Sequence, residues 1–300
     1  MDGAPNGTTV AGSPSGISGS SLNYMNTPLD VEIDASGNVY VADSQNHRIV
    51  LWTVGATSGT IVAGTGRDLT HFFSCSSRYS TQNDCSHLTK IFCLFEREMS
   101  FKYVFSGIAG TANNQLDRPY GIVHDWSTGV LYIADTYNDR IMSYASGAST
   151  GTFCIGGTGF STTQLNFPTG LYFESSSNSL YIANTQANNI VRWIVGASNW
   201  ILVAGSSSGI FGLSSTLLDY PRDVTLDYMK NVYVADCNNN RIQFFKAGQS
   251  NGTKIAGSAT GLPGSSSSLL DSPIALVVDS NFNVYVADYF NHRIQRFDHY

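Results

Sequence analysis

Short apolar segments alternate with polar turns along the chain. Runs of five or six residues rich in valine, isoleucine, leucine and tyrosine recur, and glycine, asparagine, aspartate or serine follows each of them. This punctuation is typical of short β-strands joined by tight turns. Several runs, such as residues 39–43 and 232–236, are apolar at nearly every position, which predicts strands buried on both faces. The pattern therefore indicates an all-β fold.

One pattern of strands repeats five times. Its centre reads VYVADSQNHRI from Val39, and related versions begin at Leu131, Leu180, Val232 and Val284. An apolar strand led by proline precedes each copy, and an aromatic residue follows the isoleucine of each copy by three positions. Each unit predicts four strands. Four-stranded units that repeat around an axis form a β-propeller, in which neighbouring blades bury each other's faces.

The first two units are farther apart than the others. The central alanines lie at positions 42, 134, 183, 235 and 287, so the first spacing is 92 residues and the others are 49 to 52. Removing residues 67–105 restores the regular loop. We therefore expect one domain over residues 1–300, with five recognisable blades and an insertion at 67–105. The alternative is a degenerate sixth blade within 67–105, as in six-bladed TolB-like propellers, and the insertion could also be non-coding in origin.

The two ends of the chain complement each other. The N-terminal sequence GAPNGTTVAG, from Gly3, matches GATSGTIVAG, from Gly55, which is the turn and fourth strand of the first unit. The last unit has only three strands up to Phe297. We expect the N-terminal strand to complete the last blade, which would close the ring without a free strand edge.

The units resemble NHL repeats. The resemblance rests on the Y-[VI]-A-D-x-x-N-H-R-I core and covers nearly all of the chain outside residues 67–105. The third unit departs most, with Asn184, Ala187 and Asn189 at positions where the others have Asp, Asn and Arg. The resemblance implies a propeller that binds partners, as NHL propellers do in ubiquitin ligases and receptor-like sensors.

Four units carry an aspartate at the end of the second strand and an arginine five residues later. A tight turn between them would bring the carboxylate and the guanidinium together. We interpret the pairs as a structural clasp that every blade needs, and a ring of ion or ligand sites is the alternative. The predicted pairs are Asp43 with Arg48, Asp135 with Arg140, Asp236 with Arg241, and Asp288 with Arg293.

Specificity is expected in the loops that vary between units. In a propeller, the turns between the second and third strands share one face with the loops that lead into each first strand. Tyrosine, phenylalanine and arginine dominate the energetics of protein interfaces. We predict a protein- or peptide-binding face made by the residues of these types on that side, which are Tyr120, Tyr137, Arg222, Tyr289 and Phe290.

Charge and composition narrow the function further. The formal net charge is −6 and no run of lysine or arginine exceeds two, which disfavours RNA and DNA because phosphates need a basic surface. The chain has no apolar stretch long enough to span a membrane, and residues 1–12 lack the pattern of a secretory signal. Five cysteines without a C-x-x-C motif indicate neither a zinc site nor a disulfide framework. The cellular compartment stays unassigned.

The sequence also lacks a recognisable catalytic motif. There is no G-x-S-x-G, and only His124 lies on a predicted inner strand, so we expect no metal and no cofactor. Asp30 and Asp223 stand where other units have glycine or alanine, near the channel entrance, and are the best candidates for a channel site. We predict a monomeric, non-enzymatic scaffold that binds a protein or peptide. The alternatives are the recognition part of a ubiquitin-ligase-like or receptor-like assembly, and a metal-dependent lyase or hydrolase.

Overall fold

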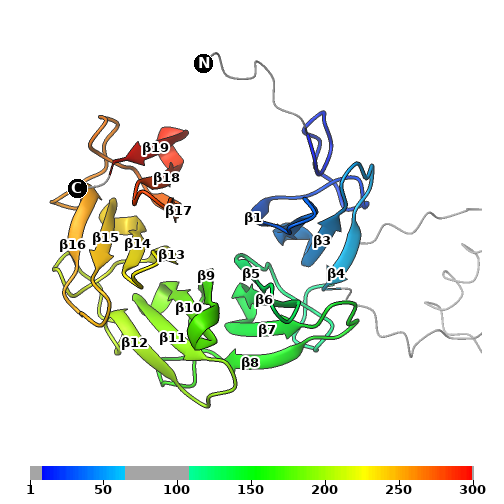
Figure 1. The fold of residues 1–300 in the computed structure, drawn as a ribbon, viewed down its shortest axis with the longest axis horizontal. Coiled ribbons are helices and arrows are strands. Elements are labelled where there is room, and N and C mark those ends of the chain that lie inside the picture. The colour runs from blue at the N-terminus through cyan, green and yellow to red at the C-terminus, as the bar shows by residue number, and fades with distance from the viewer. Residues whose placement is uncertain (1–8, 65–107, 299–300) are drawn as a thin grey trace, which may run out of the picture.

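The computed structural model describes residues 9–64 and 108–298, which form five antiparallel sheets arranged as blades of a β-propeller (Figure 1). Within these ranges the first four blades have four strands each and the fifth has three. Strand order within each blade follows the sequence, from the central channel outward. No helix of the described ranges has the length and hydrophobicity needed to cross a membrane.

The strands follow the repeats closely. The first blade has β1 (Pro28–Ile33), β2 (Val39–Asp43), β3 (Arg48–Trp52) and β4 (Thr60–Ala63). The second has β5 (Ile122–Asp125), β6 (Val130–Asp135), β7 (Arg140–Tyr144) and β8 (Thr152–Gly156). The third has β9 (Pro168–Glu174), β10 (Ser179–Asn184), β11 (Asn189–Ile194) and β12 (Trp200–Gly205). The fourth has β13 (Pro221–Leu226), β14 (Val232–Asp236), β15 (Arg241–Phe245) and β16 (Thr253–Gly257), and the fifth has β17 (Pro273–Val278), β18 (Val284–Asp288) and β19 (Arg293–Phe297).

A single 3₁₀ turn joins the second and third strands of every blade. In the first blade it covers Ser44–Asn46 and is followed by His47 in the left-handed region, with φ of 53°. The equivalent residues are Asp139, Asn188, Asn240 and His292, all with positive φ. Asparagine and aspartate tolerate this conformation better than most residues. The turn places the last residue of the second strand opposite the first residue of the third, as in the pair Asp43 and Arg48.

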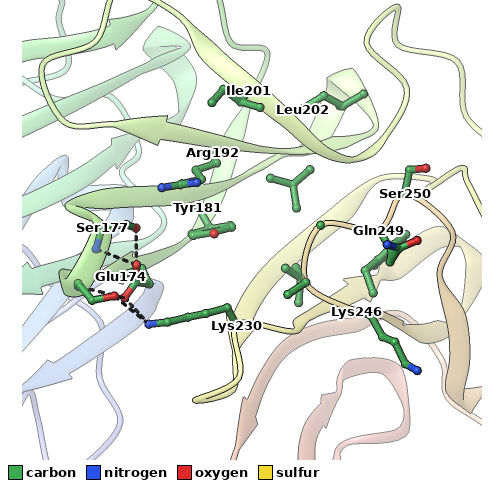
Figure 2. Close-up of a pocket in the computed structure, with 16 residues that line it drawn as sticks. Glu174, Ser177, Tyr181, Arg192, Ile201, Leu202, Lys230, Lys246, Gln249 and Ser250 are labelled. Carbon is green, nitrogen blue, oxygen red and sulfur yellow. Dashed lines mark hydrogen bonds and ion pairs between the residues drawn. The ribbon is translucent and has the colours of Figure 1, made fainter.

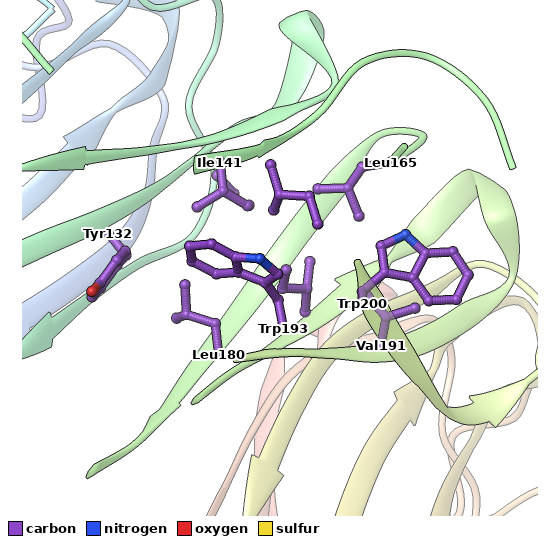
Figure 3. Close-up of a cluster of buried hydrophobic side chains, with 10 residues drawn as sticks. Tyr132, Ile141, Leu165, Leu180, Val191, Trp193 and Trp200 are labelled. Carbon is purple, nitrogen blue, oxygen red and sulfur yellow. The ribbon is translucent and has the colours of Figure 1, made fainter. Parts of the chain in front are cut away.

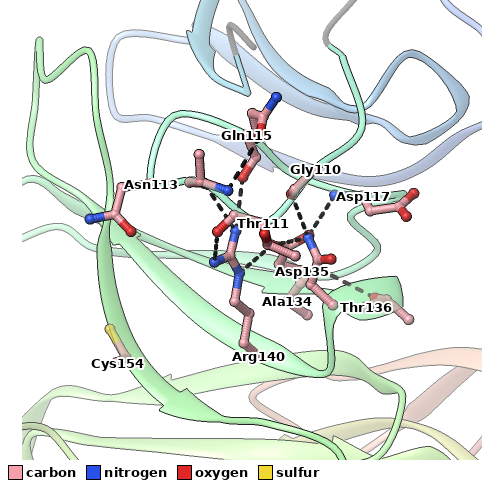
Figure 4. A network of polar contacts seen from close by, with 12 residues as sticks. Gly110, Thr111, Asn113, Gln115, Asp117, Ala134, Asp135, Thr136, Arg140 and Cys154 are labelled. Atoms are coloured by element: carbon pink, nitrogen blue, oxygen red, sulfur yellow. Dashed lines mark hydrogen bonds and ion pairs between the residues drawn. The ribbon is translucent and has the colours of Figure 1, made fainter. Parts of the chain in front are cut away.

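This register builds the clasp. In the second blade, Arg140 Nε donates to Asp135 Oδ2 at 2.6 Å, and the Nη atoms of Arg140 donate to the carbonyl oxygens of Thr111 and Gln115 at 2.6 and 3.0 Å (Figure 4). The other carboxylate oxygen of Asp135 accepts the Asp117 backbone N–H at 2.6 Å. The clasp thus ties the turn to the loop that leads into the first strand of its own blade.

The same contacts recur wherever the repeat has Asp and Arg. The Nε to Oδ2 distances are 2.6 Å in the first blade and 2.7 Å in the fourth and fifth. The third blade has a neutral version, in which Asn184 Nδ2 donates to Asn189 Oδ1 at 3.1 Å and Asn189 donates to the Ser206 carbonyl oxygen at 2.6 Å. Both arrangements satisfy the buried polar groups of the turn, so the turn keeps its shape with or without charge.

The core lies between blades rather than within them. Between the second and third blades, Ala134 and Ile141 on one side meet Leu180, Trp193 and Trp200 on the other (Figure 3). The isoleucine that follows the clasp residue is fully buried in each of the first four blades, at Ile49, Ile141, Ile190 and Ile242. Blade-to-blade packing therefore supplies most of the apolar burial that stabilises the ring.

Direct packing of the first blade on the second bears on the predicted insertion. Ala42 and Ile49 share one apolar cluster with Leu116, Ile122 and other residues of the second blade. No blade separates the two, although residues 67–105 lie between them in sequence. Residues 67–105 are outside the described residues. The described residues form five blades, and a sixth is not confirmed.

The ring is open between the fifth and first blades (Figure 1). Ile294 is 70% exposed, although its counterparts in the other blades are fully buried. On the first blade, Val31 is 56% exposed, whereas its counterpart Ile122 is 2% exposed. Residues 9 and 10 belong to no strand, and residues 1–8 are outside the described residues. Closure of the ring by the N-terminal strand is therefore not confirmed.

Candidate functional site

A pocket of about 420 Å³ opens on the loop face, at the mouth of the central channel. Such a volume suits part of a ligand or a few side chains of a bound segment. Four of the five residues predicted for the binding face line it, and both predicted channel residues lie in it as well: Tyr120, Arg222, Tyr289 and Phe290, with Asp30 and Asp223. All five blades contribute residues of the first strand or of the segment just before it, because these segments surround the channel.

Asp30 and Asp223 link neighbouring blades. Asp30 Oδ1 accepts the N–H of Val31 in its own strand, and Asp30 Oδ2 accepts the N–H of Ile122 in the next blade, at 2.9 and 2.8 Å. Asp223 repeats the arrangement with the N–H groups of Val224 and Leu276, both at 2.9 Å. Each carboxyl group therefore connects the inner strands of two neighbouring blades by hydrogen bonds, in addition to lining the pocket.

Burial governs the protonation of these acids. Burial raises the pKa of Asp223 to about 8, against the lowering effect of its two N–H donors, and the charge of Asp30 raises it further. Burial also raises the pKa of Asp30 to about 6. The pKa of Glu32 rises to about 7, through burial and then through repulsion by Asp30. Near neutral pH, Asp223 thus holds its proton, so the pocket carries less negative charge than it would if all of its carboxyl groups were ionised.

Glycine occupies the equivalent position in two blades because the backbones approach closely there. A Cβ atom on Gly170 would lie 2.3 Å from Asp223 Oδ1, and one on Gly121 would lie 2.2 Å from the Thr169 carbonyl oxygen. Neither site has room for a side chain. The glycines at this position therefore reflect packing between inner strands.

Arg222 is the cationic residue of the pocket. Its Cζ lies 5.1 Å from the ring centroid of Tyr120 and 5.4 Å from that of Tyr220, within the range of cation–π attraction. Its Nη1 atom is buried and has no hydrogen-bond partner among the described residues. An unpaired buried donor is costly, and burial also keeps this atom out of reach of a ligand, so only the other N–H groups of Arg222 can face the pocket.

The fifth predicted residue, Tyr137, lies on the same face but outside the pocket. Arg118 Cζ stacks 4.6 Å from the centroid of its ring, and Phe167 packs against it at 5.1 Å. Phe167 also lies 6.0 Å from Tyr120 and 6.5 Å from Tyr220, between ring centroids. Phe167 therefore connects Tyr137 to the rings around Arg222.

Sequence reasoning missed Arg118, Phe167 and Tyr220. Each immediately precedes the proline of a first strand, and each has positive φ, at 44°, 56° and 55°. Thr27 and Ser272, which precede the first-strand prolines of the other two blades, also have positive φ, so this conformation is a feature of the repeat. Here the strained backbone is held by the preceding blade; for example, Asp139 Oδ1 accepts the Phe167 N–H at 2.7 Å. The position before each proline was the signal that could have found them.

Tyr289 and Phe290 form an exposed lip beside the opening of the ring. They are 54% and 60% exposed and pack edge to face, with centroids 4.9 Å apart. In the second and third blades, the residue equivalent to Tyr289 is a threonine whose hydroxyl donates to the next blade; Thr136, for example, bonds the Pro168 carbonyl oxygen at 2.7 Å. The tyrosine is thus a departure from the repeat, on the face predicted to bind.

A second pocket, of about 510 Å³, lies on the opposite face between the third and fourth blades (Figure 2). Arg192, Lys230 and Lys246 line it, but Lys230 is paired with Glu174, which also accepts from Ser176 and Ser177. Glu174 accordingly has its pKa lowered to about 2 by these donors, although burial opposes them. Figure 2 shows these bonds among Glu174, Ser177 and Lys230.

Metal-binding geometry does not occur in the part of the chain that is described: no three His, Cys, Asp or Glu side chains gather there. His124, the histidine of an inner strand, stacks on Trp126 with centroids 4.2 Å apart and meets Tyr40 edge-on at 4.3 Å. Burial lowers its pKa to about 4. This histidine is a neutral member of an aromatic cluster.

Comparison with known proteins agrees with the repeat pattern. The NHL repeat matches residues 25–50, 218–245 and 270–297. No curated protein matches the sequence of the chain.

Three solved structures illustrate the similarity of fold. A chain of a nidogen/laminin complex is 15% identical, with 91% of this chain and 76% of that chain covered and a TM-score of 0.57. A protein of unknown function from Bacteroides thetaiotaomicron is 13% identical, with 97% and 75% covered and a TM-score of 0.54. A virginiamycin B lyase from Staphylococcus aureus is 11% identical, with 90% and 69% covered and a TM-score of 0.52.

Proposed function

We propose that this chain, which carries NHL repeats, is a non-enzymatic module that binds a protein or peptide segment through the loop face of its propeller. The observation that carries the proposal is the aromatic and arginine cluster at the channel mouth. Tyr120, Tyr220 and Arg222 line one pocket with the exposed lip of Tyr289 and Phe290. Aromatic side chains and arginine beside a concave surface are the usual anchors of a protein interface.

A channel lyase or hydrolase is the second candidate, favoured by the raised pKa values of Asp30, Glu32 and Asp223. Raised pKa values often mark catalytic groups. Against this candidate, both oxygens of Asp30 and of Asp223 already accept backbone N–H groups, which gives these acids a structural task. We therefore favour binding over catalysis.

The structural neighbours are compatible with more than one function. One comes from a nidogen/laminin complex and another is named a lyase, and at this level of identity the similarity concerns the fold alone. A role in a ubiquitin-ligase-like or receptor-like assembly would use the same loop face for recognition. We propose that the isolated chain is a monomer, which light scattering after gel filtration would test.

The experiment is affinity capture with variants of matched exposure on the two faces. The loop-face variant is Tyr137→Ala, Tyr289→Ala, Phe290→Ala, and the control is Trp126→Ala, Tyr228→Ala, Met229→Ala, all of which are exposed. Both variants must keep the thermal unfolding midpoint of the parent. A partner that binds the parent and the control but not the loop-face variant supports the proposal, whereas equal capture by all three contradicts it.

We also propose that the N-terminal strand closes the ring by pairing with β19. Ala11 packs against Trp52 and its neighbours on the first blade, as Ala63 packs against the second blade. Since Ile49 pairs with Ala63, Ile294 would pair with Ala11 in a closed ring. An Ala11→Cys, Ile294→Cys variant should then form a disulfide on mild oxidation, detected by peptide mass spectrometry. Failure to form it would contradict closure without affecting the binding proposal.

A further inference from the structure

We propose that the loop-face pocket recognises a carboxylate of a peptide, held by the Arg222 guanidinium, with an adjacent apolar side chain against the lip of Tyr289 and Phe290. The inference rests on the proposed binding function and specifies the chemistry of its ligand. It follows from the unpaired guanidinium, the rings that position it, and the apolar wall of the same pocket.

The arginine is positioned but not neutralised. Four arginines of the chain are bound in clasps with an aspartate. Arg222, in contrast, has no ion pair within residues 9–64 and 108–298, and its Nη1 lacks any partner there. Cation–π contacts with Tyr120 and Tyr220 hold the guanidinium at the pocket. Because Nη1 is buried, Nε and Nη2 are the donors left for a ligand. A carboxylate can accept two parallel hydrogen bonds from these two groups.

The charge of the pocket selects a carboxylate over a phosphate. Arg222 is the only Lys or Arg among the residues that line it, and Asp30 and Asp223 lie at the same pocket. A phosphate near neutral pH carries up to about two negative charges and is usually held by several cations. A single guanidinium offers at most one positive charge, and the two acids reduce it further unless they hold their protons, so the pocket cannot offset the charge of a phosphate. The same argument disfavours RNA, which needs a basic track along its backbone.

The rest of the lining favours a peptide over a small free acid. Leu29, Ile274, Tyr289 and Phe290 supply apolar surface at the same pocket as Arg222. A free small acid would leave this surface exposed to water, whereas a peptide with an apolar residue beside its acidic residue would cover it. The expected ligand is therefore a segment that contains Asp, Glu or a C-terminal carboxylate next to an apolar side chain.

The test uses two peptides that differ only in the charge, acetyl-Leu-Glu-amide and acetyl-Leu-Gln-amide. Binding is followed by NMR through the Nε–Hε signal of Arg222, which is assigned by its loss in Arg222→Lys. The acidic peptide should shift this signal saturably, and the amide peptide should not. Arg222→Gln lacks the Nε–Hε group, so its binding is followed through backbone amide shifts, and it should bind the acidic peptide at least about tenfold more weakly. Arg192→Gln, an arginine that lines the pocket on the opposite face, is the matched control and should bind as the parent does.

Three outcomes would overturn the inference. These are an equal response to the two peptides, unchanged binding by Arg222→Gln, and a stronger response to inorganic phosphate than to the acidic peptide. If a captured partner still binds Arg222→Gln as it binds the parent, the carboxylate assignment fails while the loop-face proposal stands. If that partner also binds the loop-face triple variant, the proposed function fails as well.

Discussion

Replacing Arg48 by alanine tests whether the clasp stabilises the ring. Arg48 and Asp43 have fully buried side chains, and the arginine donates to the aspartate at 2.6 Å. Arg48 also donates to the carbonyl oxygens of Ser20, Ser21 and Tyr24. The substitution removes all of these bonds and leaves the Asp43 carboxylate buried without its cation.

The expected loss of stability is large. Breaking a buried pair by removing one partner costs about 3–5 kcal/mol, mainly because the remaining charge is uncompensated. In a chain of this size, each kcal/mol shifts the unfolding midpoint by roughly 2–4 °C, so we expect a decrease on the order of 10 °C. The double variant Asp43→Asn, Arg48→Asn copies the neutral pair of Asn184 and Asn189 and should recover much of the loss, because no charge is then buried.

Thermal unfolding followed by circular dichroism measures both effects. Arg296→Ala is the control, since its ion pair with Asp298 is exposed and should contribute little. The reasoning is refuted if Arg48→Ala costs less than about 1 kcal/mol, or if the double variant is no more stable than the single one. The second result would mean that the cation matters for its carbonyl contacts and not for neutralising Asp43.

Three further predictions address the third blade and the channel. Asn184→Asp should destabilise the protein by about 1–3 kcal/mol, and adding Asn189→Arg should restore stability. Urea unfolding measures both effects, and additive losses in the double variant would contradict the pairing. Gly170→Ala should lower the free energy of unfolding by about 1–3 kcal/mol, because the new Cβ would lie 2.3 Å from Asp223 Oδ1. The control is Gly196→Ser: Gly196 has no neighbouring atoms in the way but has φ of 88°, so this variant reports backbone strain alone. Burial raises the pKa of Asp223 from 3.8 to about 8, so the folded state binds this proton more tightly than the unfolded state. The contribution of Asp223 to the free energy of unfolding therefore falls as pH rises between these values, by up to about 1.4 kcal/mol per pH unit. Asp223→Asn should flatten this slope in unfolding curves, and an unchanged slope would contradict the prediction.

The repeat made the architecture predictable. Residues such as Asp43 and Arg48 keep a fixed spacing because each blade needs the same turn, so the chemistry of one turn can be inferred from all of them. The side of the ring on which Tyr120 and Arg222 lie was predictable to the same extent, since they occupy one position of the repeat. Periodicity thus specified the face on which a side chain lies.

Contacts between different blades were not predictable in the same way. Phe167 joins Tyr137 to Tyr120 only because its backbone adopts positive φ before a proline, a choice that the preceding blade stabilises through Asp139. The bonds from Asp30 and Asp223 to the next blade likewise depend on how closely the inner strands approach. These distances follow from packing in three dimensions, which no spacing along the chain encodes.

The same contrast separates stability from function on the loop face. Where a polar side chain repeats, as with the clasp arginines, its donors are bound within its own blade and none is available to a ligand. Where a blade departs from the repeat, as at Arg222 and Tyr289, the side chain makes no such bonds and lines the loop-face pocket. Substitution at the repeated positions should therefore change stability first, and substitution at the departing positions should change binding while the fold persists.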